Sequence, residues 1–120
     1  MNYQEMKNIL NSIKDPVEKL EMLMDFGKNM PDVPQKAICN EIYGCTSRVE
    51  ICRYENRFYA VADSAIVRGI VYILISMVDG KTPREIKDMD LKSEFDSLKL
   101  NLGISRIGGV NSMINFLQNL

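Results

Sequence analysis

The chain has no histidine among its 120 residues. Histidine is the usual general base that activates a serine or cysteine nucleophile, and it is a common zinc ligand. Its absence argues against a hydrolase of ordinary Ser-His or Cys-His design and against a zinc site built with imidazole. Chemistry that needs only a side chain able to form a thiolate stays open.

An excess of charge is also missing, because 15 Lys and Arg residues balance 16 Asp and Glu residues for a net charge of -1. We therefore expect neither nucleic acid nor an anionic membrane as a partner. The longest apolar run, residues 65–78, contains Arg68 and is too short to span a bilayer. The first residues lack the pattern of a signal peptide. Together these features predict a soluble cytoplasmic protein with a single domain over residues 1–120.

Cysteine is scarce, with three residues at positions 39, 45 and 52. An odd number leaves at least one thiol unpaired, which fits a reducing compartment better than a secreted scaffold. The spacings match neither a C-x-x-C redox pair nor a zinc ribbon. Cys39 and Cys52 do not follow a turn glycine, so we expect both to be free, buried cysteines with a structural role.

The spacing of apolar residues predicts an α+β fold. Period-2 alternation in the middle of the chain indicates a three-stranded antiparallel sheet, and helical spacing on either side supplies helices that should cover mainly one face. Gly27 is expected to end the second helix, Asp63 or Ser64 to cap the long apolar helix, and Ser105 to cap the last. The expected strands are 38–43, 47–54 and 58–62, and the expected helices are 6–13, 16–26, 65–78, 83–89, 91–98 and 106–117.

Cys45 stands out because it follows Gly44 at the tip between two strand-like runs. The glycine permits a tight turn that can lift the thiol out of the sheet ladder. Thr46 and Ser47 can donate hydrogen bonds to a thiolate, and Arg48 adds a positive charge nearby. The alternative is that Cys45 is a small buried hydrophobic residue, as free cysteines often are.

Residues 43–49, which read Y-G-C-T-S-R-V, resemble the H-G-C-x-S-x-V motif of the SufE family. Three more blocks match that family in the same order: D-S-A-I-V-R-G at 63–69, G-K-T-P-R-E-I at 80–86, and Ser105-Arg106 followed by Gly109 and Met113. Iron-sulfur scaffold proteins also carry a G-C-x-S element, so the four ordered blocks carry the resemblance. With the helical lead-in from about Glu18, it spans nearly the whole chain.

The resemblance implies a SufE/IscU-like fold and a function in sulfur transfer. In that family a pyridoxal-phosphate-dependent cysteine desulfurase, of the SufS/CsdA type, holds sulfur as a persulfide that the acceptor's cysteine takes. Cys45 matches that acceptor and would pass the sulfur to a downstream iron-sulfur scaffold. The chain would act as a sulfurtransferase-type co-catalyst and activator, with no metal and no cofactor of its own, since the pyridoxal phosphate belongs to the desulfurase. The family's cysteine loop tucks against apolar residues and swings out on docking, for which Gly44 is a plausible hinge.

Five positions are candidates for supporting this loop or contacting the partner: Gly44, Ser47, Asp63, Arg68 and Arg106. A cation such as Arg106 near a thiolate would lower its pKa. Each polar candidate also has an ordinary interpretation. Asp63 can be a helix cap, and the two arginines can form surface salt bridges that contribute little to stability.

The chain departs from the family pattern at two positions. Tyr43 stands where the family often has histidine, and Glu50 stands where it often has an aromatic residue such as tryptophan. These changes affect the packing of the loop and its partner surface and leave the sulfur chemistry untouched. Cys39 and Cys52 have no counterpart in the motif.

Two other functions remain open from the sequence. An iron-sulfur scaffold would need several convergent ligands, usually three cysteines with an acid or imidazole. A non-catalytic module would bind and position a desulfurase, and its Cys45 would be inert.

Overall fold

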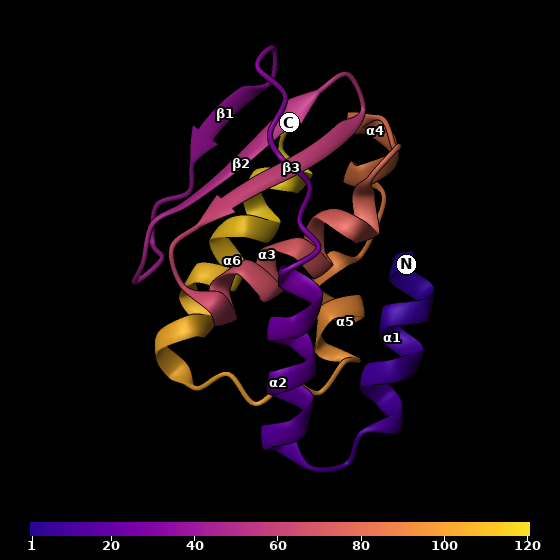
Figure 1. Ribbon diagram of the computed structural model, residues 1–120. Helices are drawn as coiled ribbons and strands as arrows, with labels where there is room; N and C mark the ends of the chain where they lie inside the picture. Colours follow the sequence, from indigo (N-terminus) through magenta and orange to yellow (C-terminus); the bar gives the residue numbers. More distant parts are fainter.

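Two helices precede a three-stranded sheet and four follow it in the computed structural model, which describes residues 1–120 (Figure 1). This arrangement confirms the predicted α+β fold, although the first two strands are shorter than expected because the chain leaves the ladder around Cys45. In order, the elements are α1 (Tyr3–Ser12), α2 (Pro16–Gly27), β1 (Ile38–Glu41), β2 (Val49–Tyr54), β3 (Arg57–Ala62), α3 (Ala65–Val78), α4 (Pro83–Lys87), α5 (Leu91–Asp96) and α6 (Ile104–Gln118).

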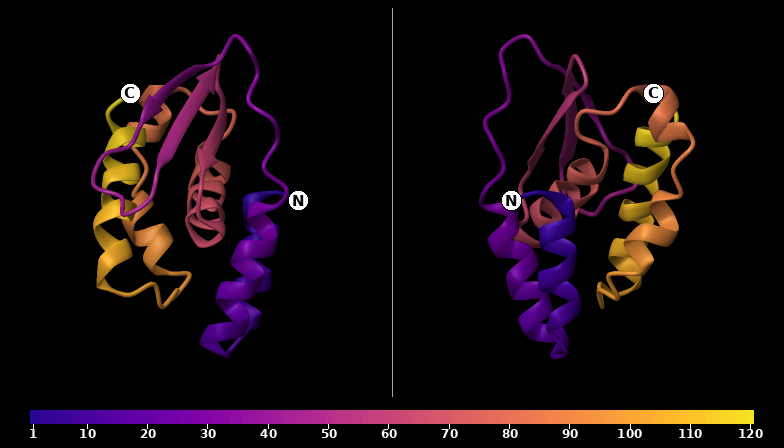
Figure 2. Two further views of the ribbon diagram at one scale, coloured as in Figure 1. Left: turned by 60° about the vertical axis from the view of Figure 1, so that its left-hand side comes forward. Right: turned by 90° about the vertical axis from the view of Figure 1, so that its right-hand side faces the viewer.

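The sheet is antiparallel with the strand order β1-β2-β3, so β2 is central. Val49 and Ile51 of β2 are buried on the face that carries the helices. The helices lie on one side of the sheet, with α3 behind β3 and α6 behind β1 and β2 (Figures 1 and 2). All four residues of β1 are exposed, which makes this edge strand the least covered part of the sheet.

Helix α3 forms the centre of the core, and nine of its 14 residues are buried. Its contact with α2 is close because both helices have a glycine there. A Cβ atom built on Gly27 would lie 2.8 Å from the backbone nitrogen of Gly69, and one built on Gly69 would meet the carbonyl of Leu23. Gly27 was predicted to cap α2, but it is the last helical residue, with Lys28 at the cap. Its lack of a side chain serves the packing of the two helices.

The N-caps of α3 and α6 differ in part from the predicted ones. Ser64 caps α3 through its hydroxyl, which accepts from the backbone of Val67, so Asp63 is not the cap. The prediction that Ser105 caps α6 is wrong, because the helix begins two residues earlier than expected, at Ile104, and Gly103 is its cap. Gly103 has a φ of +78°, a conformation that glycine adopts readily and that lets the chain turn into the helix without a polar cap.

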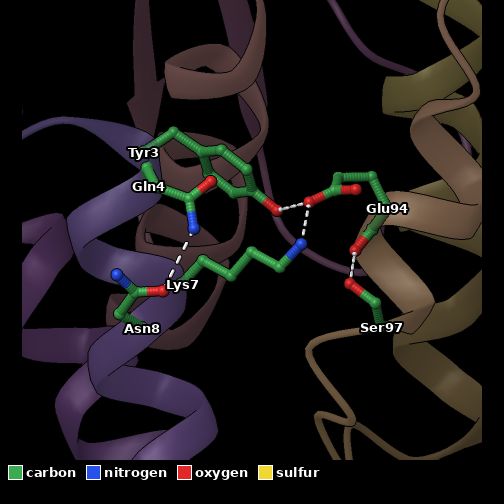
Figure 3. Close-up of polar contacts among 6 residues, drawn as sticks. All are labelled: Tyr3, Gln4, Lys7, Asn8, Glu94 and Ser97. Atoms are coloured by element: carbon green, nitrogen blue, oxygen red, sulfur yellow. Dashed lines mark hydrogen bonds and ion pairs between the residues drawn. The ribbon is translucent and has the colours of Figure 1, made fainter.

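Helix α1 is fastened to α5 by a three-residue polar contact (Figure 3). The Tyr3 hydroxyl donates to the Glu94 carboxylate at 2.6 Å, and the Lys7 ammonium donates to the same oxygen at 2.7 Å. These bonds hold the pKa of Glu94 below its usual range. Burial and the Glu94 carboxylate raise the pKa of Tyr3. The contact joins residues about 90 positions apart in the chain.

Cys39 and Cys52 form a disulfide, so the prediction that both are free is wrong. They are directly opposite in the β1–β2 register, with their Cα atoms 4.0 Å apart. Directly opposite residues of an antiparallel pair point to the same face, which brings the two sulfur atoms together. Cys52 neighbours the inward-facing Ile51, so strand alternation places the disulfide on the opposite face of the sheet. There Cys52 is fully buried, as expected, and Cys39 is exposed.

None of the helices combines the length and the apolar character that crossing a membrane would require.

Candidate functional site: the Cys45 loop on helix α6

The candidate site is the loop between β1 and β2, which lies beside α6 (Figures 1 and 2). The ladder reaches as far as the Ile42 N–H, which donates to the Val49 carbonyl at 2.9 Å. Beyond this bond Gly44 adopts a φ of +95°, as the prediction of a glycine-dependent turn requires. The turn directs Cys45 away from the strands and onto the helix.

The thiol of Cys45 is half-buried and is the one free cysteine. Its sulfur donates to the carbonyl oxygen of Gly109 in α6 at 3.8 Å. The cavity around it has only about 10 Å³ of free space, which is about the volume needed for one water molecule. Besides Cys45, its lining residues come from the loop, α3 and α6: Thr46, Val67, Ile70, Ser105, Arg106, Gly109, Val110 and Met113.

Glycines on both sides make this close approach possible. A Cβ atom on Gly44 would lie 2.6 Å from the Ser112 hydroxyl, and one on Gly109 would lie 3.0 Å from the Cys45 sulfur. Gly109 is part of the family resemblance and Ser112 of no motif, and neither residue was predicted to contact the loop. The adjacent glycines Gly108 and Gly109 inside a helix were the available signal, because glycine there costs roughly 1 kcal/mol each and often marks close packing.

Burial raises the pKa of the Cys45 thiol. No arginine contributes to this shift in the seated conformation, so the expected lowering of the pKa by a cation stays a prediction for the exposed thiolate. The exposed Arg48 guanidinium pairs with Glu50 at 2.8 Å. Arg106 does line the thiol cavity, but its guanidinium donates to the Leu102 carbonyl at 3.3 Å. In this conformation the thiol is protonated near neutral pH and shielded.

Ser47 was predicted to donate a hydrogen bond to the thiolate, but its hydroxyl makes no such bond. The Ser47 hydroxyl is buried and has no hydrogen-bond partner, while the thiol uses the Gly109 carbonyl instead. A buried polar group without a partner costs about 1–3 kcal/mol, so this residue adds to the free energy of the seated loop.

Asp63 and Arg68 lie at the junction of β3 and α3 and do not line the thiol cavity. The Asp63 N–H donates to the Arg48 carbonyl at 3.3 Å, which ties the end of the loop to β3. The Arg68 guanidinium donates to the Ala62 carbonyl at 3.1 Å. Of the predicted site residues, the structure thus brings only Gly44 and Arg106 close to Cys45.

Exposed apolar side chains occur in the Cys45 loop and at the start of α6. Tyr43 in the loop is 78% exposed, and at the start of α6 Ile104 is 90% and Ile107 is 48% exposed. Ile104 and Ile107 line a separate groove against α5, together with Phe95 and Leu100, whereas Ser105 and Arg106 line the thiol cavity. Of the three exposed apolar residues, only Tyr43 belongs to the loop that carries the thiol.

Fold and site together define a class of protein: a small α+β domain that keeps one free thiol on a glycine-tipped loop, seated against a helix. The chain belongs to the SufE family, since the family model described as "SufE: Fe-S metabolism associated domain" matches residues 4–120. The resemblance inferred from the four sequence blocks is thereby confirmed.

Several known proteins are similar to this chain. The sulfur acceptor protein CsdE of Escherichia coli (strain K12) is 31% identical over 92% of this chain and 81% of its own length. The chloroplastic quinolinate synthase of Arabidopsis thaliana is 30% identical over 98% of this chain, which spans 17% of that protein. An uncharacterized SufE-like protein of Rhizobium meliloti (strain 1021), R01000, is 27% identical over 85% of this chain and 81% of its own length.

A solved structure supports the fold independently. A hypothetical protein from Thermus thermophilus superimposes with a TM-score of 0.67, and the match covers 97% of this chain and 90% of that protein's chain. The sequence identity is 12%, so this likeness shows the fold alone.

Proposed function

We propose that this chain accepts sulfur on Cys45 from a pyridoxal-phosphate-dependent cysteine desulfurase, activates that enzyme, and passes the sulfur on for iron-sulfur cluster assembly. The observation that carries the proposal is the one free thiol of a SufE-family domain, held on a loop whose turn depends on Gly44. The similarity to a protein named a sulfur acceptor supports the same role. All chemistry that needs pyridoxal phosphate takes place on the partner, so the chain needs no cofactor of its own.

The transfer step is a thiol exchange. The Cys45 thiolate attacks the terminal sulfur of the desulfurase persulfide, and a new bond forms between that sulfur and Cys45 Sγ. The bond between the terminal sulfur and the desulfurase cysteine breaks, and that cysteine leaves as a thiolate. Cys45 ends as a persulfide with no net oxidation or reduction. A thiol of a downstream iron-sulfur scaffold then takes the sulfur in the same way.

Reaction requires the thiol to leave its seat. The cavity has room for about one water molecule, and burial raises the pKa of Cys45, so the seated thiol is both shielded and protonated. Docking of the desulfurase would release it, and the exposed Tyr43 side chain in the same loop offers the partner an apolar contact. A Tyr43→Ser variant should therefore weaken activation of the desulfurase.

We place this activity in the cytoplasm, because a reducing compartment preserves a free thiol. The Cys39–Cys52 disulfide argues the other way, since disulfides are rare there. Rapid acid quenching of cells, followed by thiol labelling, measures how much of the pair is oxidised. A largely reduced pair supports the proposed compartment, and a fully oxidised pair contradicts it.

The test is to incubate the protein with a cysteine desulfurase, pyridoxal phosphate and cysteine, and then to locate added sulfur by non-reducing peptide mass spectrometry. We expect one added sulfur atom on the Cys45 peptide, absent when the desulfurase is omitted. A Cys45→Ser variant should accept no sulfur and should not stimulate the desulfurase.

The two alternatives make different predictions. A non-catalytic module would still stimulate the desulfurase in the Cys45→Ser variant. An iron-sulfur scaffold would need three cysteine ligands, yet Cys39 and Cys52 are bonded to each other on the face of the sheet opposite the helices. This observation favours the acceptor over the scaffold.

A further inference from the structure

Helix α6 carries two adjacent glycines under the Cys45 loop, and they are not equivalent. A Cβ atom on Gly109 would lie 3.0 Å from Cys45 Sγ, 3.4 Å from its Cα and 3.5 Å from its Cβ. A Cβ atom on Gly108 would lie no closer than 3.8 Å to the Gly44 carbonyl oxygen, an ordinary contact distance. Neither glycine has a positive φ, so an alanine at either position keeps the helical backbone.

The hydrogen bonds that hold the loop down are few. Residues 43–47 make no main-chain hydrogen bond, and the loop is fastened at its ends by the Ile42–Val49 and Asp63–Arg48 bonds. Between these ends, the hydrogen bond of the seated thiol is the long bond to the Gly109 carbonyl. A small steric change under the thiol should therefore shift the balance between a seated and a displaced loop.

We propose that Gly109 is a positioning residue that sets how often Cys45 is seated, because its missing side chain makes room for the thiol and its carbonyl receives the S–H. The proposal deepens the sulfur-acceptor function and rests on it for its biological meaning. Seating protects the thiol, and displacement presents it to a partner. A methyl group at position 109 pushes the loop toward the displaced state.

The matched pair of variants is Gly109→Ala and Gly108→Ala. Both exchange a helical glycine for alanine, so both gain a similar helix propensity of roughly 1 kcal/mol. Only the first adds a methyl group at 3.0 Å from the thiol sulfur. The readout is the rate of iodoacetamide alkylation of Cys45 as a function of pH, without reductant, so that Cys39 and Cys52 stay bonded.

For Gly109→Ala we expect alkylation near neutral pH to be faster by about three- to tenfold, since a pKa drop of one unit gives about tenfold more thiolate. The midpoint of the pH profile should also move down toward that of an ordinary cysteine. Gly108→Ala should behave like the unmodified protein. Equal profiles for Gly109→Ala and the unmodified protein, or equal acceleration in both variants, would overturn the proposal.

A stability measurement keeps the proposal testable if Gly109→Ala folds poorly. The loss of stability caused by Gly109→Ala should shrink in a Cys45→Ala background, where the sulfur that meets the new methyl group is gone. An unchanged loss would mean that the clash lies elsewhere, and would contradict the proposal. Because alkylation needs no desulfurase, failure of this positioning role and failure of the acceptor function give separate results.

Discussion

The molecule treats its cysteines in two opposite ways on two faces of one sheet. Cys39 and Cys52 sit in paired strands, where the register places them directly opposite each other and joins them in a disulfide. Cys45 follows Cys39 by six residues but lies beyond the end of the ladder, where Gly44 turns it toward α6. Fixed pairing favours a permanent bond, whereas a loop held by a few weak contacts keeps a thiol available. Backbone position therefore decides which cysteine can do chemistry.

The largest expected difference between Cys45 and the Cys39–Cys52 pair is in sulfur acceptance, which should depend on the Cys45 sulfur alone. Cys45→Ser should abolish sulfur acceptance completely, because a hydroxyl cannot form the persulfide. The double variant Cys39→Ala/Cys52→Ala should still accept sulfur at close to the unmodified rate. The measurement is desulfurase-dependent labelling with radioactive sulfur from cysteine. Loss of labelling in the double variant would break the division between the two sites.

Stability should respond in the reverse way. The disulfide closes a loop with a sequence separation of 13, for which removal costs about 3 kcal/mol in the chain-entropy model. We expect Cys39→Ala/Cys52→Ala to lower the free energy of unfolding by about that amount, and Cys45→Ser to change it by less than about 1 kcal/mol. Urea unfolding of both variants without reductant gives the values. Similar losses of unfolding free energy in both variants would show that the packing of Cys45 stabilises the fold as much as the disulfide does.

The pH dependence of Cys45 sharpens the comparison further. Burial raises the pKa of the seated thiol, so in the folded protein its alkylation should rise with pH at higher values than in a peptide of residues 42–50. The same raised pKa means that the protonated, seated form contributes stability below the ordinary thiol pKa. This contribution is lost as the pH rises through the folded pKa. A midpoint at or below that of the peptide would contradict the seated, protonated thiol.

The smallest expected effect on stability comes from the Tyr3–Lys7–Glu94 contact. This contact is remote from both cysteine sites and serves as a control for Cys45 alkylation. The hydrogen bonds from Lys7 and Tyr3 lower the pKa of Glu94, so their contribution to stability is present above the ordinary carboxyl pKa and is lost as the pH falls through the lowered value. Both Lys7 and Glu94 are partly exposed, so Glu94→Gln should cost about 1 kcal/mol at pH 7. This difference should shrink in acid, and Cys45 alkylation should not change. A changed alkylation rate would mean that lower global stability alone is enough to expose Cys45.

The turn at Cys45 and the half-buried middle strand could be predicted from the sequence because each depends on neighbouring residues. Gly44 before Cys45 indicated the turn, and the alternation through β2 indicated a half-buried strand; both are present. The disulfide could not be predicted because it depends on strand register, and a slip of one residue would place Cys39 and Cys52 on opposite faces. The Gly109 contact joins residues 64 positions apart, so no local pattern contained it. An arginine effect on the seated thiol is absent because Arg48 pairs with Glu50 and the Arg106 guanidinium donates to the Leu102 carbonyl.

The most direct test of the account is to find which cysteine carries sulfur after incubation with a cysteine desulfurase. A protease that cleaves after glutamate separates the three cysteines, because Glu41 lies between Cys39 and Cys45, and Glu50 lies between Cys45 and Cys52. Non-reducing mass spectrometry should then show one added sulfur atom on the Cys45 peptide, and an unmodified disulfide between the other two peptides. Added sulfur on Cys39 or Cys52, or an unmodified Cys45 beside an activated desulfurase, would contradict the account.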